Sequence, residues 1–573
     1  MKGNEKMKKS QGSMKLGKIL ITFAVMAIGL TAVACSPAQK NAHEDTTTEG
    51  LNKDTTAGGT TAENITTPNT SENFPSPIDG EAYYVDSVNG DDENDGRSPK
   101  TAFRTLSRAN KVTLKNGESL LFRAGCEFKG TLTPKRERDG TTIHIGRYGE
   151  GDDPQITAPR GNALTLTDFD FVVVSNLTII NPNGICGIYI NNKAGGAIKD
   201  VHIKNCTIKD VNKGRSVYQY ESGGIICASF SDEPGWFDGL VIEDNTIENV
   251  ARSGIFLTSF WANRPTKLWG KNEYVSDTEN WWPSYGVVVK GNKIDRTGGD
   301  GIVLIGTQDA LIEYNTVYRI NFEPVTPCAN AGIWPQSSNG CVIRYNEVAY
   351  SLKPQGVADA TAFDVDLSCR DTIIEYNYSH DNQGGFLLLC ELNDTNDSHG
   401  FTGTVVRNNV SINDGEVFGS LIPIVGPVRD VLIENNTFYF SGRWVSNIMY
   451  VWSEDGQNQV KGVQFRRNIV VSDGNGNGHH FANGENFSFE GNLYWGKHKG
   501  YPEDEIDAVV ADPLIDFSGK APKGWENAVR YSPKEGSPAF ESSSLPLKPA
   551  DKDYCGTVVG SINYAGAFVK EYK

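Results

Sequence analysis

The feature that most constrains this chain is an asparagine that returns within one repeated pattern. From about residue 170, an alternating apolar segment leads to Asn, then to a second apolar alternation, a loop and a short strand-like run. Alternation with a period of two predicts strands, and a strand-turn-strand unit of this size cannot bury its own apolar face, so successive units must stack. The shorter intervals are roughly 23 to 32 residues, the size of a solenoid turn. The asparagines are Asn176, Asn205, Asn245, Asn292, Asn315, Asn346, Asn377, Asn409, Asn436, Asn468 and Asn492.

Asparagine suits the bend of such a unit, because it tolerates the left-handed backbone region and its amide can bond the equivalent amide one rung away. In this the chain resembles the pectate-lyase-like superfamily of right-handed parallel β-helix carbohydrate-active proteins, over roughly Tyr83 to Trp495. The resemblance implies an all-β, single-stranded right-handed parallel β-helix with long loop insertions and an irregular C-terminal tail. The ladder is specific for architecture and not for activity, and an array of β-sandwiches is the alternative.

The start of the domain fits the same superfamily. A first strand and an acidic, Gly-rich turn within Tyr83 to Gly96 lead into a short helix, expected over Phe103 to Lys111, that caps the open end. The turn could hold Ca²⁺ through its three aspartates. It departs from the EF-hand pattern at the third and twelfth ligand positions, however, so turn roles are favoured over a metal site. The three aspartates are Asp91, Asp92 and Asp95.

The first 35 residues predict export. A basic stretch precedes an uncharged apolar run from Ile19 to Ala34, which has the length of a signal-peptide core and is short for a membrane span. The run ends Leu-Thr-Ala-Val-Ala before Cys35 and resembles the lipobox of bacterial lipoproteins. We therefore expect lipid attachment at Cys35 and a lipid-anchored protein at the bacterial cell surface or outer membrane, with ordinary secretion as the alternative.

Composition divides the rest of the chain. Residues 36–79 are rich in Thr, Glu, Asn and Gly with few large apolar residues, which predicts a disordered tether. Residues 80–168 would form the N-terminal cap and first coils, residues 169–495 the β-helix repeats, and residues 496–573 an irregular segment packed along or over the far end. Nine cysteines remain after Cys35 without paired spacing, so buried free thiols are expected. The net charge of −17 argues against nucleic acid and anionic membranes as partners.

Short strands opened by a small residue predict one exposed sheet, and in the resembled superfamily the substrate groove runs along such a sheet. These runs begin at Gly187, Gly224, Gly254, Gly301, Gly332, Ala362 and Gly385. The residue after each opener should point inward and the next outward. On this register the expected core residues are Ile333, Phe363, Val365, Phe386 and Leu388, and the outward ones are Trp334, Gln336, Asp364, Asp366 and Glu391.

The outward acids Asp364, Asp366 and Glu391 would lie on two adjacent rungs, which stack about 4.8 Å apart. Carboxylates about 5 to 5.5 Å apart suit a retaining glycosidase and a wider gap suits inversion, and both outcomes stay open. Crowded negative charges should raise one pKa, as a general acid requires. Solvated strand ends or ligands of a structural cation are the alternative roles. Arg370 and His380 are weaker candidates for substrate contact, because ion pairing and a surface loop explain them as well.

Two long insertions lie upstream. The first carries Tyr218, Tyr220 and Glu221, and the second runs from Ser259 to Tyr285. Sugar rings pack their C–H faces on aromatic rings, so these loops could bind substrate, or the rings could form the loops' own small core. The second insertion contains Phe260, Trp261, Arg264, Lys267, Trp269, Trp281 and Trp282.

These features favour an extracellular glycoside hydrolase acting on a polysaccharide or oligosaccharide and requiring no cofactor. The first alternative is a Ca²⁺-dependent polysaccharide lyase in which the acids bind metal and Arg370, Lys353 or Arg344 is the base. The second is a non-catalytic glycan-binding surface β-helix, for which the aromatic loops suffice.

Overall fold

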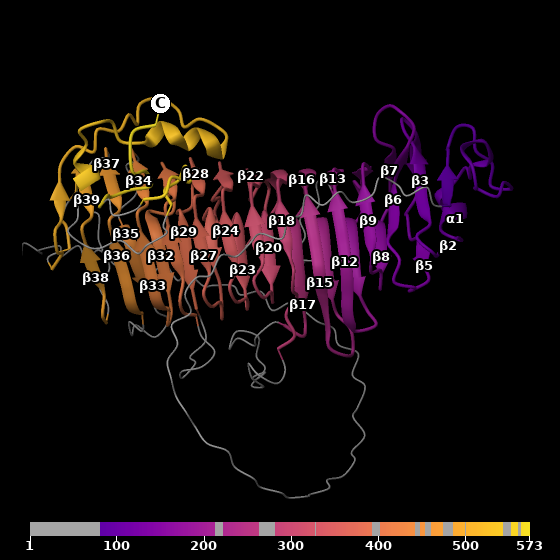
Figure 1. Cartoon of the computed structure of the whole chain (residues 1–573), viewed down its shortest axis with the longest axis horizontal. Coiled ribbons are helices and arrows are strands. Elements are labelled where there is room, and N and C mark those ends of the chain that lie inside the picture. The colour runs from indigo at the N-terminus through magenta and orange to yellow at the C-terminus, as the bar shows by residue number, and fades with distance from the viewer. Residues whose placement is uncertain are drawn as a thin grey trace, which may run out of the picture.

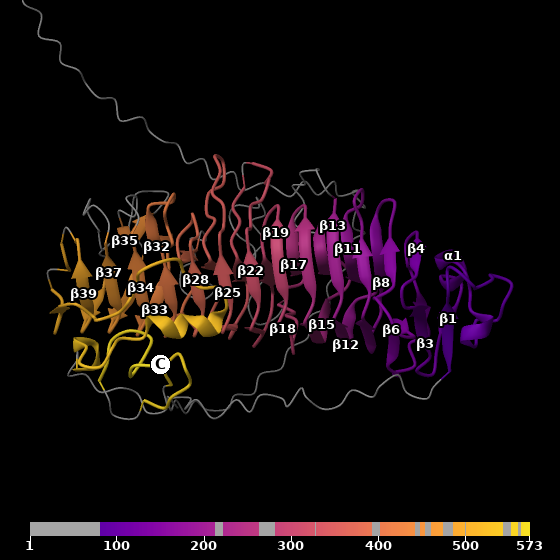
Figure 2. The same ribbon diagram turned by 90° about the horizontal axis from the view of Figure 1, so that it is seen from above.

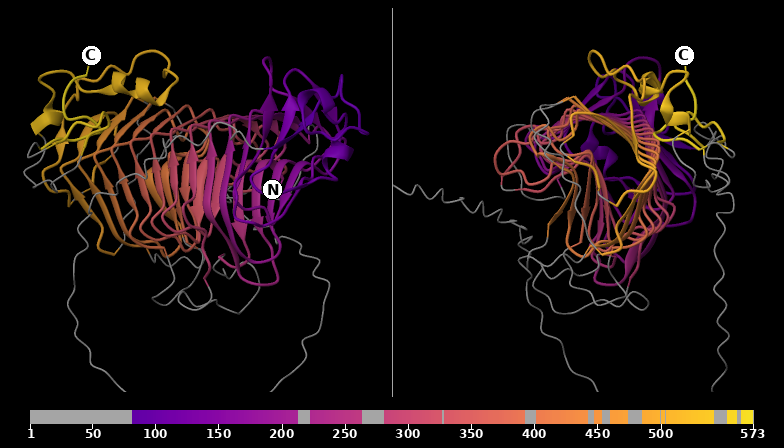
Figure 3. Two further views of the ribbon diagram at one scale, coloured as in Figure 1. Left: turned by 45° about the vertical axis from the view of Figure 1, so that its right-hand side comes forward. Right: turned by 90° about the vertical axis from the view of Figure 1, so that its left-hand side faces the viewer.

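The computed structural model of the chain describes residues 81–212, 222–262, 281–326, 328–391, 401–441, 447–452, 460–473, 485–498, 500–502, 504–541, 552–559 and 563–572. The chain is a right-handed parallel β-helix (Figure 1). Three long parallel sheets, here called sheets I, II and III, enclose a common interior (Figure 3). The fold inferred from the asparagine repeat is therefore confirmed.

Sheet I consists of β1 (Ala82–Val85), β3 (Ser119–Arg123), β6 (Ile143–Tyr148), β9 (Val172–Ser175), β12 (Gly196–Lys204), β15 (Gly235–Glu243), β18 (Val288–Lys290), β21 (Leu311–Glu313), β24 (Val342–Arg344), β27 (Ile373–Glu375), β30 (Val405–Arg407), β33 (Arg429–Glu434), β36 (Lys461–Arg466) and β38 (Ser488–Glu490). Sheet II consists of β4 (Glu127–Lys129), β7 (Gln155–Thr157), β10 (Thr178–Ile180), β13 (Thr207–Val211), β16 (Thr246–Val250), β19 (Lys293–Thr297), β22 (Thr316–Tyr318), β25 (Glu347–Ala349), β28 (Tyr378–His380), β31 (Val410–Ile412), β34 (Thr437–Phe440), β37 (Ile469–Ser472), β39 (Leu493–Gly496) and β40 (Val509–Val510).

Sheet III consists of β8 (Asn162–Thr167), β11 (Cys186–Asn192), β14 (Gly223–Ser229), β17 (Ser253–Ser259), β20 (Ile302–Ile305), β23 (Ile333–Gln336), β26 (Phe363–Val365), β29 (Leu387–Cys390), β32 (Ser420–Val425) and β35 (Asn447–Trp452). The remaining elements are the paired strands β2 (Thr113–Leu114) and β5 (Lys135–Arg136), helix α1 (Leu106–Ala109), and the 3-10 helices η1 (Pro99–Thr101), η3 (Trp525–Tyr531) and η4 (Pro538–Glu541). No helix among the described residues is long and apolar enough to cross a membrane.

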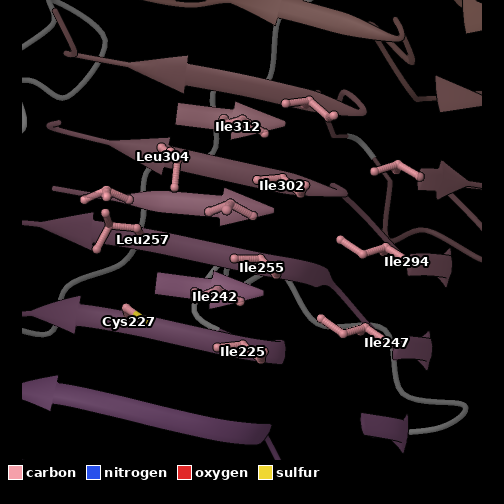
Figure 4. Close-up of a cluster of buried hydrophobic side chains, with 14 of the residues drawn as sticks. Ile225, Cys227, Ile242, Ile247, Ile255, Leu257, Ile294, Ile302, Leu304 and Ile312 are labelled. Atoms are coloured by element: carbon pink, nitrogen blue, oxygen red, sulfur yellow. The ribbon is translucent and has the colours of Figure 1, made fainter. Parts of the chain in front are cut away.

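Identical side chains stack from coil to coil in the interior. Ile225 on β14 pairs in register with Ile255 on β17, which pairs with Ile302 on β20. All three are fully buried and lie above one another in Figure 4. Because strand side chains alternate, each coil sends one set of residues into this shared core and the other set outward. Neighbouring coils thus complete the core that one coil cannot form alone.

An uninterrupted asparagine ladder runs from Asn245 to Asn492. Each Nδ2 donates to Oδ1 of the next asparagine at 2.9 to 3.1 Å. Each Oδ1 of the later coil also accepts the backbone N–H of the earlier asparagine, as in the bond from Asn315 N to Asn346 Oδ1 at 2.9 Å. Every ladder amide is buried, so these bonds satisfy groups that water does not reach.

The ladder differs from the expectation in two respects. The left-handed residue is the one before each ladder asparagine, for example Tyr314 with φ 57° and Tyr345 with φ 53°. Asn176 and Asn205 occupy this left-handed position themselves, with φ 56° and 52°. In the coil of Asn205 the ladder place belongs to Cys206, whose N–H donates to Asn245 Oδ1 at 3.0 Å. The repeat of Asn alone could not separate these two neighbouring places.

The aspartates of the N-terminal turn close turns and cap the following helix. Asp92 accepts the backbone N–H groups of Arg104 and Thr105, both at 2.9 Å, just before α1. Asp91 and Asp95 each accept an N–H two residues ahead. These bonds agree with the turn roles favoured for the three aspartates, and the predicted capping helix is shorter than expected, covering only α1.

The C-terminal segment lies outside the coil, along sheet II near the far end (Figure 2). Its rings pack on outward rings of that sheet, as in the stack of Phe517 on Tyr439 with centroids 4.2 Å apart. The described cysteines are free thiols, and all except Cys328 and Cys555 are buried, as the spacing predicted.

Candidate active site

The outer face of sheet III carries apolar side chains on most coils and carboxylates on one. Val303 of β20 pairs in register with Trp334 of β23, and Ile333 of β23 pairs with Phe363 of β26. Continuing this register places Asp364 beside Trp334 and Asp366 beside Gln336. The predicted outward direction of these four side chains agrees with the structure, because Ile333, Phe363 and Val365 fill the core between them.

The next coil departs from the predicted register. Phe363 pairs with Leu387, and Asp364 with Leu388, so the strand is shifted by one residue from the alignment on Gly385. Phe386 and Leu387 both enter the core, whereas Leu388, predicted to be core, packs outside with Cys390 and Leu367. Two consecutive inward residues, Phe386 and Leu387, break the alternation. A prediction that assumes strict alternation therefore assigns each later residue of this strand to the opposite face of the sheet.

Glu391 is consequently not an outward carboxylate of the candidate site. Its side chain is fully buried, and Oε2 accepts the backbone N–H of Ser368 at 2.8 Å and of Phe401 at 3.1 Å. These bonds hold the Glu391 carboxylate against the backbone of Ser368 and Phe401, which is a structural role. The predicted catalytic role of Glu391 is therefore not supported by its position, although its charge still acts on Asp366.

Asp364 and Asp366 do lie on the same outer face. Asp364 is within β26, and Asp366 is the residue directly after this strand. Asp364 is 5% exposed and its Oδ1 has no hydrogen-bond partner. Burial, together with the charge of Asp366, raises the pKa of Asp364 well above its usual range. Asp366 is half-buried; burial and nearby charges raise its pKa to about 7, against the N–H of Leu367 that Oδ1 accepts at 2.9 Å. One side chain is thus a buried acid, and the other is a carboxyl group that solvent reaches.

Two further aspartates belong to this cluster and were missed in the sequence. Asp359 is 8% exposed; burial raises its pKa to about 6, although the Lys353 charge opposes the rise. Asp300 is fully buried, and its charge raises the pKa of both Asp359 and Asp364. Both lie in turns just before strands of sheet III, where no alternation marks their direction. A carboxylate one to three residues before a strand opener was the available signal.

Trp334 and Gln336 form the neighbouring coil of the site. Trp334 is 6% exposed, and its indole N–H donates to Asp300 Oδ1 at 2.9 Å. Gln336 is also buried. Trp334 belongs to an outward apolar cluster with Phe256 and Val303. It therefore forms a wall beside the carboxylates and is too buried to be the exposed platform predicted for a sugar ring.

The aromatic residues of the second insertion divide between packing and exposure. Trp261 and Trp281 are half-buried, and their indole N–H groups donate to the backbone carbonyls of Ser231 and Ala262 at 3.0 and 2.9 Å. Trp282 is 39% exposed and stacks on Trp236, with centroids 5.3 Å apart. The loop's own packing is thus seen for Trp261 and Trp281, whereas Trp282 remains a predicted sugar-binding ring. Outside the described residues lie Tyr218, Tyr220, Glu221, Arg264, Lys267 and Trp269.

His380 does not lie at the candidate site. It ends β28 in sheet II, a different wall of the coil, and its ring is fully buried rather than exposed in a loop. Arg370 lies in the turn after sheet III, where it bridges to Asn339 and Thr402 of the adjacent coils.

The other basic residues considered as a lyase base are engaged elsewhere. Arg344 is on β24 in sheet I, paired with Glu313 at 2.9 Å. Lys353 is near the cluster, but its Nζ donates to the carbonyls of Val357 and Ala358, each at 2.5 Å. It therefore holds the loop that leads to Asp359. No group of three or more His, Cys, Asp or Glu side chains in the described ranges is arranged to hold a metal ion.

Comparison with known proteins agrees with this architecture. Residues 156–351 match a family described as the right handed beta helix region. The chain is 25% identical over 450 residues to a lacto-N-biosidase of Bifidobacterium longum subsp. longum, a match that covers 63% of this chain and 27% of that protein. The native crystal structure of the GH136 lacto-N-biosidase from Eubacterium ramulus superposes with a TM-score of 0.53 at 24% identity, over 67% of this chain and 68% of that one. Its selenomethionine derivative gives the same TM-score and identity over 66% of this chain and 68% of that one.

Proposed function

We propose that this β-helix protein is a glycoside hydrolase that cleaves a polysaccharide or oligosaccharide at the carboxylates of β26 and its flanking turns. The observation that carries the proposal is Asp366, a half-buried carboxyl group whose pKa is raised to about 7. A general acid works best when its pKa lies near the operating pH, and raised carboxyl pKa values of this kind suit protonation of a leaving-group oxygen. The similarity to lacto-N-biosidases supports a hydrolase.

Asp359 is the best partner for Asp366. The two side chains are close enough for the charge of Asp359 to raise the pKa of Asp366. With a pKa of about 6, Asp359 is largely ionised at neutral pH, and the Lys353 charge favours that state. A glycosidase needs one protonated and one ionised carboxyl group, the second acting as nucleophile or as base toward water. We therefore assign Asp366 as general acid and Asp359 as the ionised partner. Asp364, whose pKa is raised well above its usual range, remains protonated.

The reaction class is tested by incubating purified protein with neutral oligosaccharides, beginning with substrates of lacto-N-biosidases, and with uronate polymers. We expect new reducing ends without a rise in absorbance at 235 nm. An absorbance rise on uronate polymers identifies a lyase instead, and binding with neither signal identifies a glycan-binding protein.

The residue assignment is tested with Asp366→Asn and Asp359→Asn. Each should lower kcat by about 10²- to 10⁴-fold, the usual contribution of general acid-base catalysis. The matched control is Glu375→Gln in sheet I, which removes a buried carboxylate paired with Arg407 away from the site. Wild-type turnover in both aspartate variants would refute the assignment.

A further inference from the structure

A buried arginine lies behind the coil that carries Asp359, Asp364 and Asp366, here called the acidic coil. Arg252, in the turn between β16 and β17, is 5% exposed, and its Nη2 lies 3.0 Å from Oδ2 of Asp300. Its Nη1 donates to Oδ1 of Asn330 at 2.5 Å, 78 residues further along the chain. The guanidinium therefore crosses the coil of Asp300 and reaches the coil beyond it.

A glycine leaves the space for this crossing. A Cβ atom on Gly299 would lie 1.7 Å from Nη1 of Arg252, so any larger residue there would displace the guanidinium from its present place. The local sequence Gly-Gly-Asp before β20 thus combines a gap for the arginine with the aspartate that it pairs. This is a built arrangement, because a buried arginine is costly unless it is paired and hydrogen-bonded.

Asp300 connects this arginine to the candidate site. Oδ1 accepts the indole N–H of Trp334 at 2.9 Å and the backbone N–H of Ala331 at 3.1 Å, while Oδ2 faces Arg252. Two hydrogen bonds and one ion pair around one buried carboxylate fix both its orientation and that of the indole. Trp334 in turn lies beside Asp364 in the register of sheet III.

We propose that Asp300 is a positioning residue of this hydrolase site: paired with Arg252, it fixes Trp334 against the coil of Asp364 and holds a negative charge behind the reacting carboxylates. The inference rests on the proposed function. The charged and titratable groups that act on Asp300 or feel its charge are Arg252, Cys328, Asp359 and Asp364. Arg252 is the cation among these groups. The ion pair of Arg252 and Asp300 therefore decides how much negative charge acts on Asp359 and Asp364.

The two roles of Asp300 are separated by two variants. Asp300→Asn retains an acceptor for Trp334 but removes the charge, whereas Trp334→Phe removes the hydrogen bond and retains the charge. Asp414→Asn is the matched control, since Asp414 is also buried and hydrogen-bonded but follows β31 in sheet II. For each folded variant, kcat and KM are measured against pH, and a potentiometric difference titration against wild type records proton binding between pH 5 and 8.

We expect Asp300→Asn to move the acidic coil's titration and the pH–rate profile downward by about 0.5 to 1 pH unit. Trp334→Phe should lower kcat/KM by about tenfold or more without moving the profile, because it misplaces a wall of the site. Arg252→Met should also lower kcat/KM, and Arg252→Lys, which keeps the positive charge, should lower it less.

Two results overturn the inference in distinguishable ways. If folded Asp300→Asn titrates like wild type, or if Trp334→Phe moves the pH profile as far as Asp300→Asn does, Asp300 does not act as proposed, even though hydrolysis itself persists. If wild-type protein cleaves no glycan, the proposed function fails and the catalytic role of Asp300 fails with it, while the titration still reports its charge.

Discussion

Nε2 of His380 lies 3.1 Å from Oε1 of Glu347, and both side chains are fully buried on the outer side of sheet II. Nδ1 of His380 faces Asp381 at 2.9 Å, so both ring nitrogens meet carboxylates. Oε2 of Glu347 accepts the N–H of Gly524, which ties the C-terminal segment to the same group. Burial alone would lower the pKa of His380, but hydrogen bonds to Asp381 and Glu347 outweigh it and the pKa is raised.

This pair predicts a loss of stability at alkaline pH. A raised pKa in the folded state means that protonation of His380 stabilises the fold fully below its unfolded pKa of about 6.5, and that this contribution disappears as pH rises through the folded value. The thermal midpoint of wild type should therefore fall between pH 6.5 and 8.5 by more than that of His380→Gln. Equal falls in both proteins would contradict the prediction.

The acidic coil predicts a narrow pH–rate profile. Asp359 must be ionised and Asp366 protonated, and their pKa values are raised to about 6 and about 7. Activity should be lost below about pH 6 as Asp359 gains its proton and above about pH 7 as Asp366 loses its own. The acid and alkaline limbs of the profile report macroscopic pKa values of the coupled carboxyl groups. Asp364→Asn should therefore shift both limbs. A flat profile from pH 5 to 8 would argue against carboxylate catalysis.

The asparagine ladder predicts that two asparagines contribute very differently to the stability of the fold. Asn346→Ala removes a buried amide that bonds Asn377 and the carbonyl of Ile312, and it leaves several partners unsatisfied. Because each orphaned buried group costs about 1 to 3 kcal/mol, the thermal midpoint should fall by several degrees. Asn205→Ala is the control, because Asn205 is exposed and occupies only the left-handed place. Comparable losses in the two variants would be inconsistent with the ladder's role.

The stacked pair of Trp236 and Trp282 predicts a contribution to glycan binding. Trp282 is 39% exposed, and Trp236 supports its ring from sheet I. Trp282→Ala should raise KM for long substrates by roughly tenfold or less, as expected for loss of one aromatic contact of about 1 kcal/mol, and leave the pH profile unchanged. An unchanged KM for every chain length would show that the ring takes no part.

The predicted lipobox gives a test that does not depend on the fold. Cys35→Ser should abolish incorporation of labelled fatty acid and release the protein from the membrane fraction, because the acyl chains are the expected anchor. Retention of label in the variant would place any lipid elsewhere.

Sequence reasoning reached the architecture because one coil repeats its neighbour, so that every asparagine and small-residue opener adds to the same signal. It also placed Asp364 and Asp366 on one outer wall. It failed at Phe386 and Leu387, where two inward residues in succession invert the alternation and move Glu391 off that wall. It missed Asp300 and Asp359, because turns have no period and only their places shortly before the openers Gly301 and Ala362 marked them. Arg252 was beyond its reach, because the arginine acts across two coils.

Because the three sheets are built by stacking one coil on the next, the repeat region of the protein is modular along its axis. The acidic cluster depends on consecutive coils from Arg252 to Cys390, and inserting one additional repeat there would separate its members by one coil spacing of about 4.8 Å. The coils that precede β16 carry no such restriction. Whole coils can therefore be added or removed on the N-terminal side of β16. Such a change alters the length of the β-helix and leaves the distances between the acidic side chains unchanged.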